Sequence, residues 1–169
     1  LVANATELNG MTTNDKDANY MLRKDITLPT GTHTLIGTEA APFKGRFDGM
    51  FHKISGLTLG AGTSTEYVGL FGTTNGATIM NVGLKNADLS AVKFGGGLVG
   101  HAKGNTVISA VYNESTAGIG HAGYAGGLVG WLDSSSLDNA YNTTNFSQGG
   151  GLVGQFDGTS KIYAVYNSG

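Results

Sequence analysis

The chain has 169 residues, a formal charge of −2 and only 13% charged side chains. The low share of charged residues argues against disorder, because disordered chains carry more charge. The chain contains 29 glycines, 2 prolines and no cysteine, and the many glycines argue against a helical protein, because glycine weakens helices. The sequence has no basic run and no stretch of about 18 apolar residues, so we expect neither a nucleic-acid partner nor a membrane-spanning helix. Many short strands joined by tight turns fit this composition best.

The amino-terminal part, residues 1–60, differs from the rest of the chain. We predict a short helix near residues 6–8 and strands over residues 20–28 and 52–59. The segment of residues 41–54 contains a glycine turn at "DG", which predicts either a hairpin or a coil with a wide corner. Because the end of a stacked sheet is an open edge that needs a cover, we interpret this part as a cap followed by the first coil.

A five-residue motif recurs through the remaining part, residues 61–169. The motif "GGLVG" occurs at residues 96–100, 126–130 and 150–154, and its near copy "VGLFG" occurs at 68–72. The copies are 24 to 30 residues apart, and such a period is typical of a solenoid, a propeller or an array. A propeller blade needs four strands, whereas each unit offers two short ones and no helix-length segment. We therefore predict an all-β, right-handed parallel β-helix, or β-solenoid, with one motif per coil in a single continuous domain.

The repeated positions predict rows of identical side chains along the stack. A glycine, a leucine and a second glycine recur in each copy: Gly69, Leu70 and Gly72; Gly97, Leu98 and Gly100; Gly127, Leu128 and Gly130; Gly151, Leu152 and Gly154. We expect the leucines to stack in the core, and the glycines to form coil corners and to let backbones approach closely. A Tyr-Asn pair follows the last three copies, at Tyr112, Tyr141 and Tyr166, and Leu84 holds the tyrosine position of the first. We expect the tyrosines to stack and the asparagines to form a hydrogen-bond ladder.

These motifs, with "YMLRKDITL" (20–28) and "APFKGRFDGMFHKISGLTL" (41–59) before them, resemble the GLUG-motif proteins over about residues 20–167. That family occurs in large exported bacterial proteins: filamentous-haemagglutinin-like adhesins of two-partner secretion, and IgA-protease-type metallopeptidases. The resemblance implies a β-helical repeat segment and no activity for the repeat itself. The peptidases use a zinc motif, H-E-x-x-H, which this sequence lacks, so no peptidase role passes to any residue here.

The sequence offers no set of residues that predicts catalysis or metal binding. Residues 95–100 match the G-x-G-x-x-G motif of dinucleotide-binding folds, but the match recurs and no helix is expected after it. The histidines lack metal-ligand spacing, and His101 holds the position that Trp131 and Gln155 take in later copies, which predicts an exposed position. The carboxylates do not recur at equivalent positions, as catalytic pairs on neighbouring coils would. We expect no cofactor, no metal and no catalysis.

We interpret the chain as a non-catalytic segment of a secreted or surface-exposed bacterial adhesin, a virulence factor that mediates or supports attachment to host cells, matrix or glycans. We expect contacts from the loop of residues 113–124, with His121 and Tyr124, and from Trp131, because exposed aromatic rings suit carbohydrate stacking; packing of Trp131 on a neighbouring coil is the alternative. We also expect further coils of the same polypeptide. The rival interpretations are a passive stalk and a carbohydrate-active β-helix enzyme. Sequons for glycosylation begin at Asn4, Asn113, Asn142 and Asn145.

Overall fold

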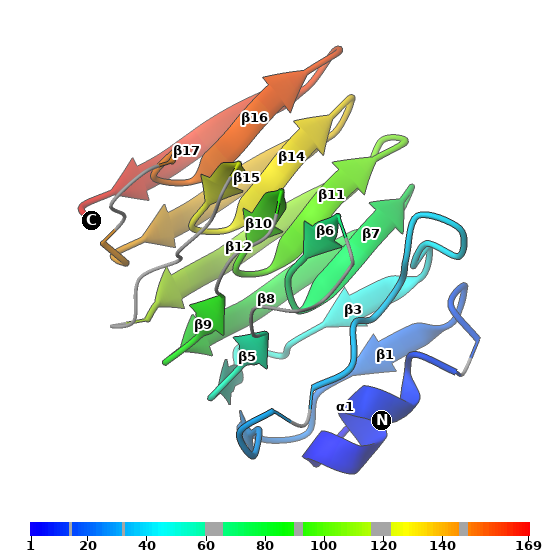
Figure 1. Ribbon diagram of the computed structural model, residues 1–169. Coiled ribbons are helices and arrows are strands. Elements are labelled where there is room, and N and C mark those ends of the chain that lie inside the picture. Colours follow the sequence, from blue (N-terminus) through cyan, green and yellow to red (C-terminus); the bar gives the residue numbers. More distant parts are fainter. Residues whose placement is uncertain (14, 32, 60–65, 90–92, 116–122, 146–148) are drawn as a thin grey trace.

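The structure is a computed structural model that describes residues 1–13, 15–31, 33–59, 66–89, 93–115, 123–145 and 149–169. Strands account for 52% of it and helix for 4%, and the strands belong to parallel coils that stack into a β-solenoid of about four turns (Figure 1). The predicted all-β solenoid is therefore confirmed. Nowhere in the described ranges does a helix have the length and apolar character needed to cross a membrane.

Within the described ranges, two large parallel sheets form the layers of the solenoid (Figure 1). The long sheet has eight strands: β1 (Asn19–Met21), β2 (Ile26–Thr27), β3 (Arg46–Asp48), β4 (Lys53–Ser55), β8 (Thr78–Lys85), β12 (Val107–Glu114), β15 (Ser136–Asn142) and β17 (Lys161–Asn167). The four-stranded sheet contains β7 (Phe71–Asn75), β11 (Val99–Lys103), β14 (Val129–Asp133) and β16 (Val153–Asp157). Two smaller groups complete the described strands: β6 (Tyr67–Val68), β10 (Phe94–Gly96) and β13 (Tyr124–Gly126), and the pair β5 (Thr58–Leu59) and β9 (Asp88–Leu89).

The core lies between the two large sheets and consists of rows that run along the stack. In the four-stranded sheet, Val99 pairs in register with Phe71 on one side and with Val129 on the other, and all three are fully buried. The backbone N–H of Leu98 donates to the carbonyl of Leu128 (2.9 Å), and both side chains are fully buried. Because each buried leucine or valine stabilises the fold by about 1.5–3 kcal/mol, the stacking of coils supplies the core that no coil has alone. Leu70, Leu98 and Leu128 are fully buried and Leu152 is half-buried, so the motif leucines lie in the core as predicted.

The second glycine of each "GGLVG" lies against the asparagine of the Tyr-Asn pair in the same coil. A Cβ atom on Gly97 would lie 2.8 Å from Nδ2 of Asn113 and 2.5 Å from the carbonyl oxygen of Gly127, both too close for a real side chain. The same relation holds between Gly127 and Asn142. Both asparagines are fully buried. The motif and the Tyr-Asn pair are therefore two halves of one contact.

The last glycine of the motif lets the three-stranded sheet pack directly on the four-stranded sheet. A Cβ atom on Gly130 would lie 3.0 Å from the backbone nitrogen of Gly95, and one on Gly154 would lie 2.7 Å from the backbone nitrogen of Ala125. In Figure 1 the short strands β6 and β10 accordingly lie across the front of the longer strands. Side chains that follow the motif are covered by this third layer.

The register corrects one predicted equivalence in the first copy. Tyr112 pairs with Gly83, and Asn113 pairs with Leu84, so Leu84 occupies the asparagine position and not the tyrosine position. The ring of Tyr112 lies where a side chain at position 83 would otherwise project, which accounts for the glycine there. The other tyrosines are in the predicted register, Tyr112 with Tyr141 and Tyr141 with Tyr166.

The amino-terminal end of the stack is covered by the short helix α1 (Ala5–Gly10), seen at the bottom of Figure 1. The side chain of Asn4 accepts a hydrogen bond from the backbone N–H of Glu7 (2.9 Å) and so caps the helix. Leu8 and Met11 are fully buried in the common core. The predicted helix is thus present, with bounds slightly wider than residues 6–8.

The segment of residues 41–54 does not form a hairpin, because both of its strands pair in parallel with the same neighbour. Strand β3 pairs with the first half of β8 and β4 with the second half. Between them, Met50 and Phe51 adopt positive φ angles of 50° and 63°, which bends the chain out of the sheet. The hairpin alternative is therefore wrong.

Candidate functional site

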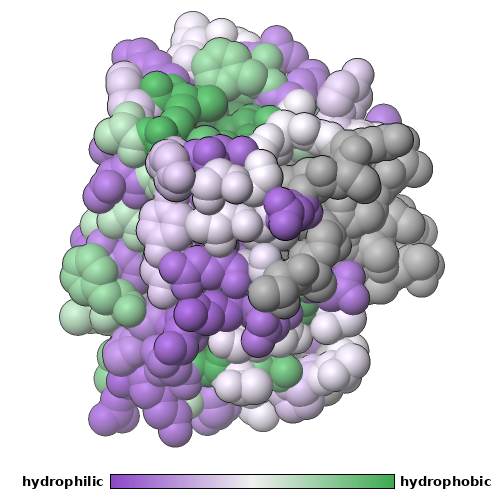
Figure 2. All heavy atoms as spheres, turned by 90° about the vertical axis from the view of Figure 1, so that its left-hand side faces the viewer, coloured by the Kyte–Doolittle hydropathy of each residue, from purple (hydrophilic) through white to green (hydrophobic). Residues whose placement is uncertain are grey.

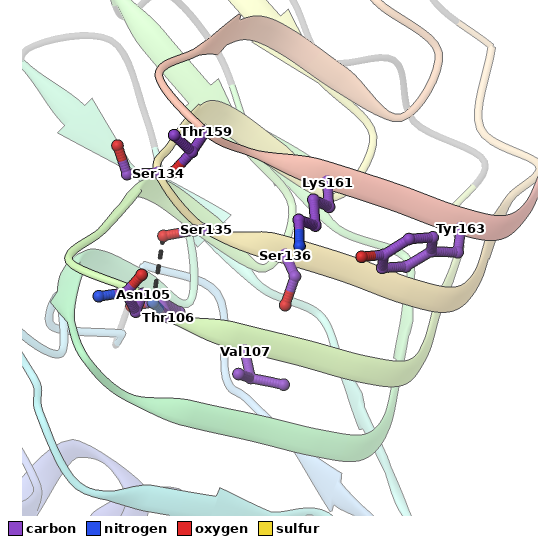
Figure 3. A pocket seen from close by; sticks show the side chains of 9 residues that line it. All are labelled: Asn105, Thr106, Val107, Ser134, Ser135, Ser136, Thr159, Lys161 and Tyr163. Carbon is purple, nitrogen blue, oxygen red and sulfur yellow. Dashed lines mark hydrogen bonds between the residues drawn. The ribbon is translucent and has the colours of Figure 1, made fainter.

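A groove of about 380 Å³ crosses the outer face of the long sheet over the coils that contain β12, β15 and β17 (Figure 3). We call it the hydroxyl groove, because most of the side chains that line it carry hydroxyl groups. On one side lie residues of the turns between the two large sheets: Asn105, Thr106, Ser134, Ser135 and Thr159. The strands contribute Val107, Ser136, Lys161 and Tyr163. Three consecutive coils therefore build one surface.

Beneath the hydroxyl groove lies a ladder of buried and half-buried hydroxyl groups with structural roles. The backbone N–H of Thr106 donates to Oγ of Ser135 in the next coil (3.1 Å), and the N–H of Ser135 donates to Oγ of Ser160 in the coil after it (3.2 Å). Each hydroxyl also donates to a carbonyl of its own turn, as Thr106 does to Lys103 (2.8 Å). These groups satisfy turn backbone that no sheet partner reaches, so the floor is fixed before any ligand arrives.

Above this floor, the hydroxyl groove presents polar groups that are open to solvent. The side chains of Asn105, Ser136, Thr159 and Lys161 form no hydrogen bond or ion pair with other described residues. In Figure 3, Lys161 extends toward Ser136 in the middle of the groove, and the ring of Tyr163 lies on the side away from the turns. Tyr163 is 50% exposed. None of the residues that line the groove is an aspartate or glutamate.

The next column on the same face contains a stack of two of the three predicted tyrosines. The rings of Tyr112 and Tyr141 are nearly parallel, at 4°, with centroids 5.0 Å apart. The hydroxyl of Tyr141 donates to Oε1 of Glu114 (2.7 Å), whose other oxygen accepts from Lys85 (3.0 Å). Burial, followed by this hydrogen bond to a carboxylate, raises the pKa of Tyr141 to about 12. Because the two rings cover each other's faces, they present mainly edges to a ligand.

Of the three residues predicted to contact a ligand, the structure brings two to one aromatic cluster. The ring of Trp131 stacks on His101 (centroids 4.3 Å apart, 7°) and on Phe94 (5.3 Å), so the packing alternative for Trp131 holds. Tyr124 also stacks on Phe94 (5.4 Å) and is 53% exposed. His121 lies outside the described residues. Only Tyr124 of this cluster offers a substantial surface to a partner.

The prediction that His101 is exposed is wrong, because the three-stranded sheet covers it. His101 is 4% exposed, its Nδ1 lies 3.2 Å from Oε2 of Glu39, and its Nε2 has no hydrogen-bond partner. Burial lowers the pKa of His101, against the smaller opposing effect of Glu39. Burial acts to raise the pKa of Glu39, but hydrogen bonds from Lys103 and His101 outweigh it and hold that pKa below its usual value. His101 in β11 thus connects the repeat coils to Glu39 in the amino-terminal part of the chain.

The motif of residues 95–100 has the geometry of a coil corner. Strand β10 ends at Gly96 and β11 begins at Val99, and no helix follows, as a dinucleotide-binding turn would require. Among the described residues, no group of three or more His, Cys, Asp or Glu side chains could hold a metal ion.

Two of the four sequons have a structural use that explains them. Asn113 and Asn142 are fully buried, and their side-chain oxygens accept hydrogen bonds from the backbone N–H groups of Ser115 (3.1 Å) and Thr144 (3.3 Å). The hydroxyl of Thr144 in turn accepts from the N–H of Ser115 in the preceding coil (3.2 Å). The Asn-X-Ser/Thr pattern at these positions is therefore a coil-stacking device, and both asparagines are out of reach of a glycosyltransferase in the folded chain.

No family model, no curated protein and no solved structure matches the chain. Its function is therefore inferred from its own surface. The sequence interpretation missed the hydroxyl groove, although a signal was present: a polar turn, "KGNT", "DSSS" or "DGTS", follows each of the last three motifs at the same distance. Equal spacing in a solenoid places such turns side by side.

Proposed function

We propose that this chain is a non-catalytic β-solenoid segment of a secreted or surface-exposed bacterial adhesin, of the GLUG-repeat kind, that attaches to a host glycan or protein. The observation that carries the proposal is the hydroxyl groove, in which three coils present unpaired hydroxyl, amide and ammonium groups on a pre-formed floor. Such groups form the hydrogen bonds that orient a polar ligand. The stacked coils hold them in place without a loop having to order on binding.

Two features favour attachment over catalysis. Hydrolysis of a glycosidic bond canonically needs two carboxyl groups placed on either side of the bond that breaks. The residues lining the hydroxyl groove include no carboxylate, and its one cation, Lys161, lies among neutral side chains. A carbohydrate-active enzyme would turn over a polysaccharide, whereas an adhesin binds it unchanged, so product analysis separates these two classes.

A passive stalk is the second rival, and the exposed end of the stack bears on it. At the end formed by β16 and β17, Phe156 is 51% exposed and Ile162 is 36% exposed, although both continue buried rows of the core. Figure 2 shows the hydrophobic side chains gathered at the top of the molecule, over this last coil. Our proposal therefore includes further coils of the same polypeptide, stacked on this end. A stalk shares this feature but predicts no ligand for the hydroxyl groove.

The experiment is binding of the purified chain to a glycan array and to immobilised host matrix proteins, with two matched variants. Ser136→Trp fills the middle of the hydroxyl groove, and Met21→Trp adds the same side chain to the opposite end of the same sheet. We expect the first variant to abolish binding and the second to retain it. Binding by neither the original chain nor the Met21→Trp variant would favour the stalk.

A further inference from the structure

The lysine in the hydroxyl groove differs from the other lysines of the repeat coils. Lys85 pairs with Glu114, Lys93 with Glu66, and Lys103 with Glu39. These three lysines therefore have a charge partner within the protein. Lys161 has none among the described residues and is exposed, although it lies on the same sheet as Lys85. Its ammonium group is available to an anion from outside.

The surroundings of Lys161 limit how much negative charge an incoming ligand can carry. Asp138 lies on the same outer face, in register with Tyr163 of the neighbouring strand, and forms no ion pair with Lys161 or with any other described residue. Asp133 and Asp157 end the strands beside the turns of the groove, where they accept hydrogen bonds from Ser134 (2.9 Å) and from the backbone of Gly158 (3.2 Å). The hydroxyl groove thus contains one cation, while Asp133, Asp138 and Asp157 lie within two residues of side chains that line it. A single anionic group gains from Lys161, whereas a densely charged polymer is repelled by the rim.

The neutral groups around Lys161 indicate what the rest of the ligand must be. Asn105, Ser136 and Thr159 have open donors and acceptors, spread over three coils that are about 4.8 Å apart. A molecule with several hydroxyl groups over about 10 Å matches this spacing. The half-exposed ring of Tyr163 supplies the flat apolar wall on which a sugar ring packs.

We infer that the hydroxyl groove binds a short saccharide that bears one carboxylate, with the carboxylate at Lys161 and the sugar hydroxyls at Ser136 and the neighbouring turns. This inference depends on the proposed attachment function and specifies its ligand. The groove should bind uronic and sialic acid residues more tightly than neutral sugars. It should also bind these acidic sugars more tightly than polysulfated chains.

The test is a titration of the isotope-labelled chain, followed by NMR, with four probes: sialyllactose, lactose, a glucuronic-acid-ended disaccharide and heparin. We expect shifts at Ser136, Lys161 and Tyr163 with the two acidic probes and at least tenfold weaker binding of lactose and of heparin. Lys161→Met is expected to weaken the binding of the acidic probes at least tenfold. Asp138→Asn, which removes a charge of opposite sign from the same face, is expected to leave their affinity unchanged or to raise it.

Three outcomes would overturn the inference. If lactose and sialyllactose bound equally and Lys161→Met changed neither affinity, the ligand's carboxylate would have no role in binding. The attachment proposal itself would remain. Tighter binding of heparin contradicts the single-charge argument. Binding of no saccharide, while the chain still attaches to a matrix protein through a surface that Ser136→Trp blocks, replaces the glycan with a protein ligand. Circular dichroism and the melting temperature of Lys161→Met establish that the variant is folded.

Discussion

The side-chain amide of Asn113 donates a hydrogen bond to the carbonyl oxygen of Gly127, which belongs to the motif of the next coil (2.8 Å). The same asparagine fills the space beside Gly97 in its own coil. One side chain thus fixes the height of one coil above another and leaves room for no side chain at the motif glycine. The relationship explains why the "GG" and "YN" pairs occur together in the last three copies of the repeat.

Replacing this asparagine is expected to destabilise the whole stack. In Asn113→Ala, the carbonyl of Gly127 and the hydroxyl of Ser115 both lose a buried partner, while the N–H of Ser115 keeps its hydrogen bond to Thr144. We expect the free energy of unfolding to fall by about 2–3 kcal/mol, since each unsatisfied buried group costs about 1–3 kcal/mol. Urea denaturation measures this change. Asn145→Ala, an exposed asparagine in the same region, should change it by less than about 0.5 kcal/mol, and equal losses in the two variants would contradict the assignment.

The rows of the core could be predicted from the sequence because their signal is local and repeated. Leu98 and Leu128 occupy the same place in identical pentapeptides, and in a solenoid identical places must stack. Tyr112 and Tyr141 were predictable for the same reason. The register of the first copy of the repeat was less predictable: the structure places Leu84 one position away from the predicted one, and no asparagine marks the register there.

The third layer and the hydroxyl groove could not be predicted in this way. The three-stranded sheet packs on the four-stranded sheet because the last glycine of the motif lets two backbones approach, as Gly130 does against Gly95, and composition does not show which backbone comes close. His101 therefore resembled an exposed polar residue although it is buried under Tyr67 of β6. The groove consists of polar turn residues, which any surface loop contains, and only the stacking of three turns makes them a site.

The hydrogen bond from Tyr141 to Glu114 gives the tyrosines a distinguishable titration. With its pKa at about 12, Tyr141 should ionise after tyrosines of ordinary pKa in an absorbance titration at alkaline pH. Because the folded-state pKa lies above the unfolded value, the stabilisation is complete below about pH 10 and is lost as the pH rises through 12. In Tyr141→Phe the late phase should disappear, and the pKa of Glu114, which this bond holds low, should rise. If the late phase persisted in the variant, it would belong to another residue and not to Tyr141.

His33 should make the stability depend on pH in the acid range. Its Nε2 lies 3.0 Å from the carbonyl of Leu70, and burial lowers its pKa to about 4. Between about pH 6.5 and 4 the unfolded chain binds a proton that the folded chain does not, so stability is complete above pH 6.5 and falls as the pH decreases through this window. The full effect is about 3 kcal/mol. In His33→Asn, urea denaturation at several pH values should give a shallower dependence, and identical slopes for the two proteins would refute the role of His33.

A coil added to the exposed end should stabilise the chain. Phe156 and Ile162 project from the last coil with no coil above them, whereas their counterparts one coil earlier, Leu132 and Leu137, are fully buried. Appending a copy of residues 114–142 directly after Asn167 would place a leucine over each of them and would pair the free edges of β16 and β17. Because coil stability in such arrays is a sum of coil and interface terms, we expect the melting temperature to rise by several degrees.

The matched control for the added coil keeps its length and removes its apolar rows. In that version, serine replaces the copies of Leu128, Val129, Leu132 and Leu137, so that the loops remain and these core contacts do not. Its melting temperature should equal that of the original chain. If both versions gave the same increase, or neither gave any, the exposed end would not be a stacking surface, and the case for further coils would lose its physical support.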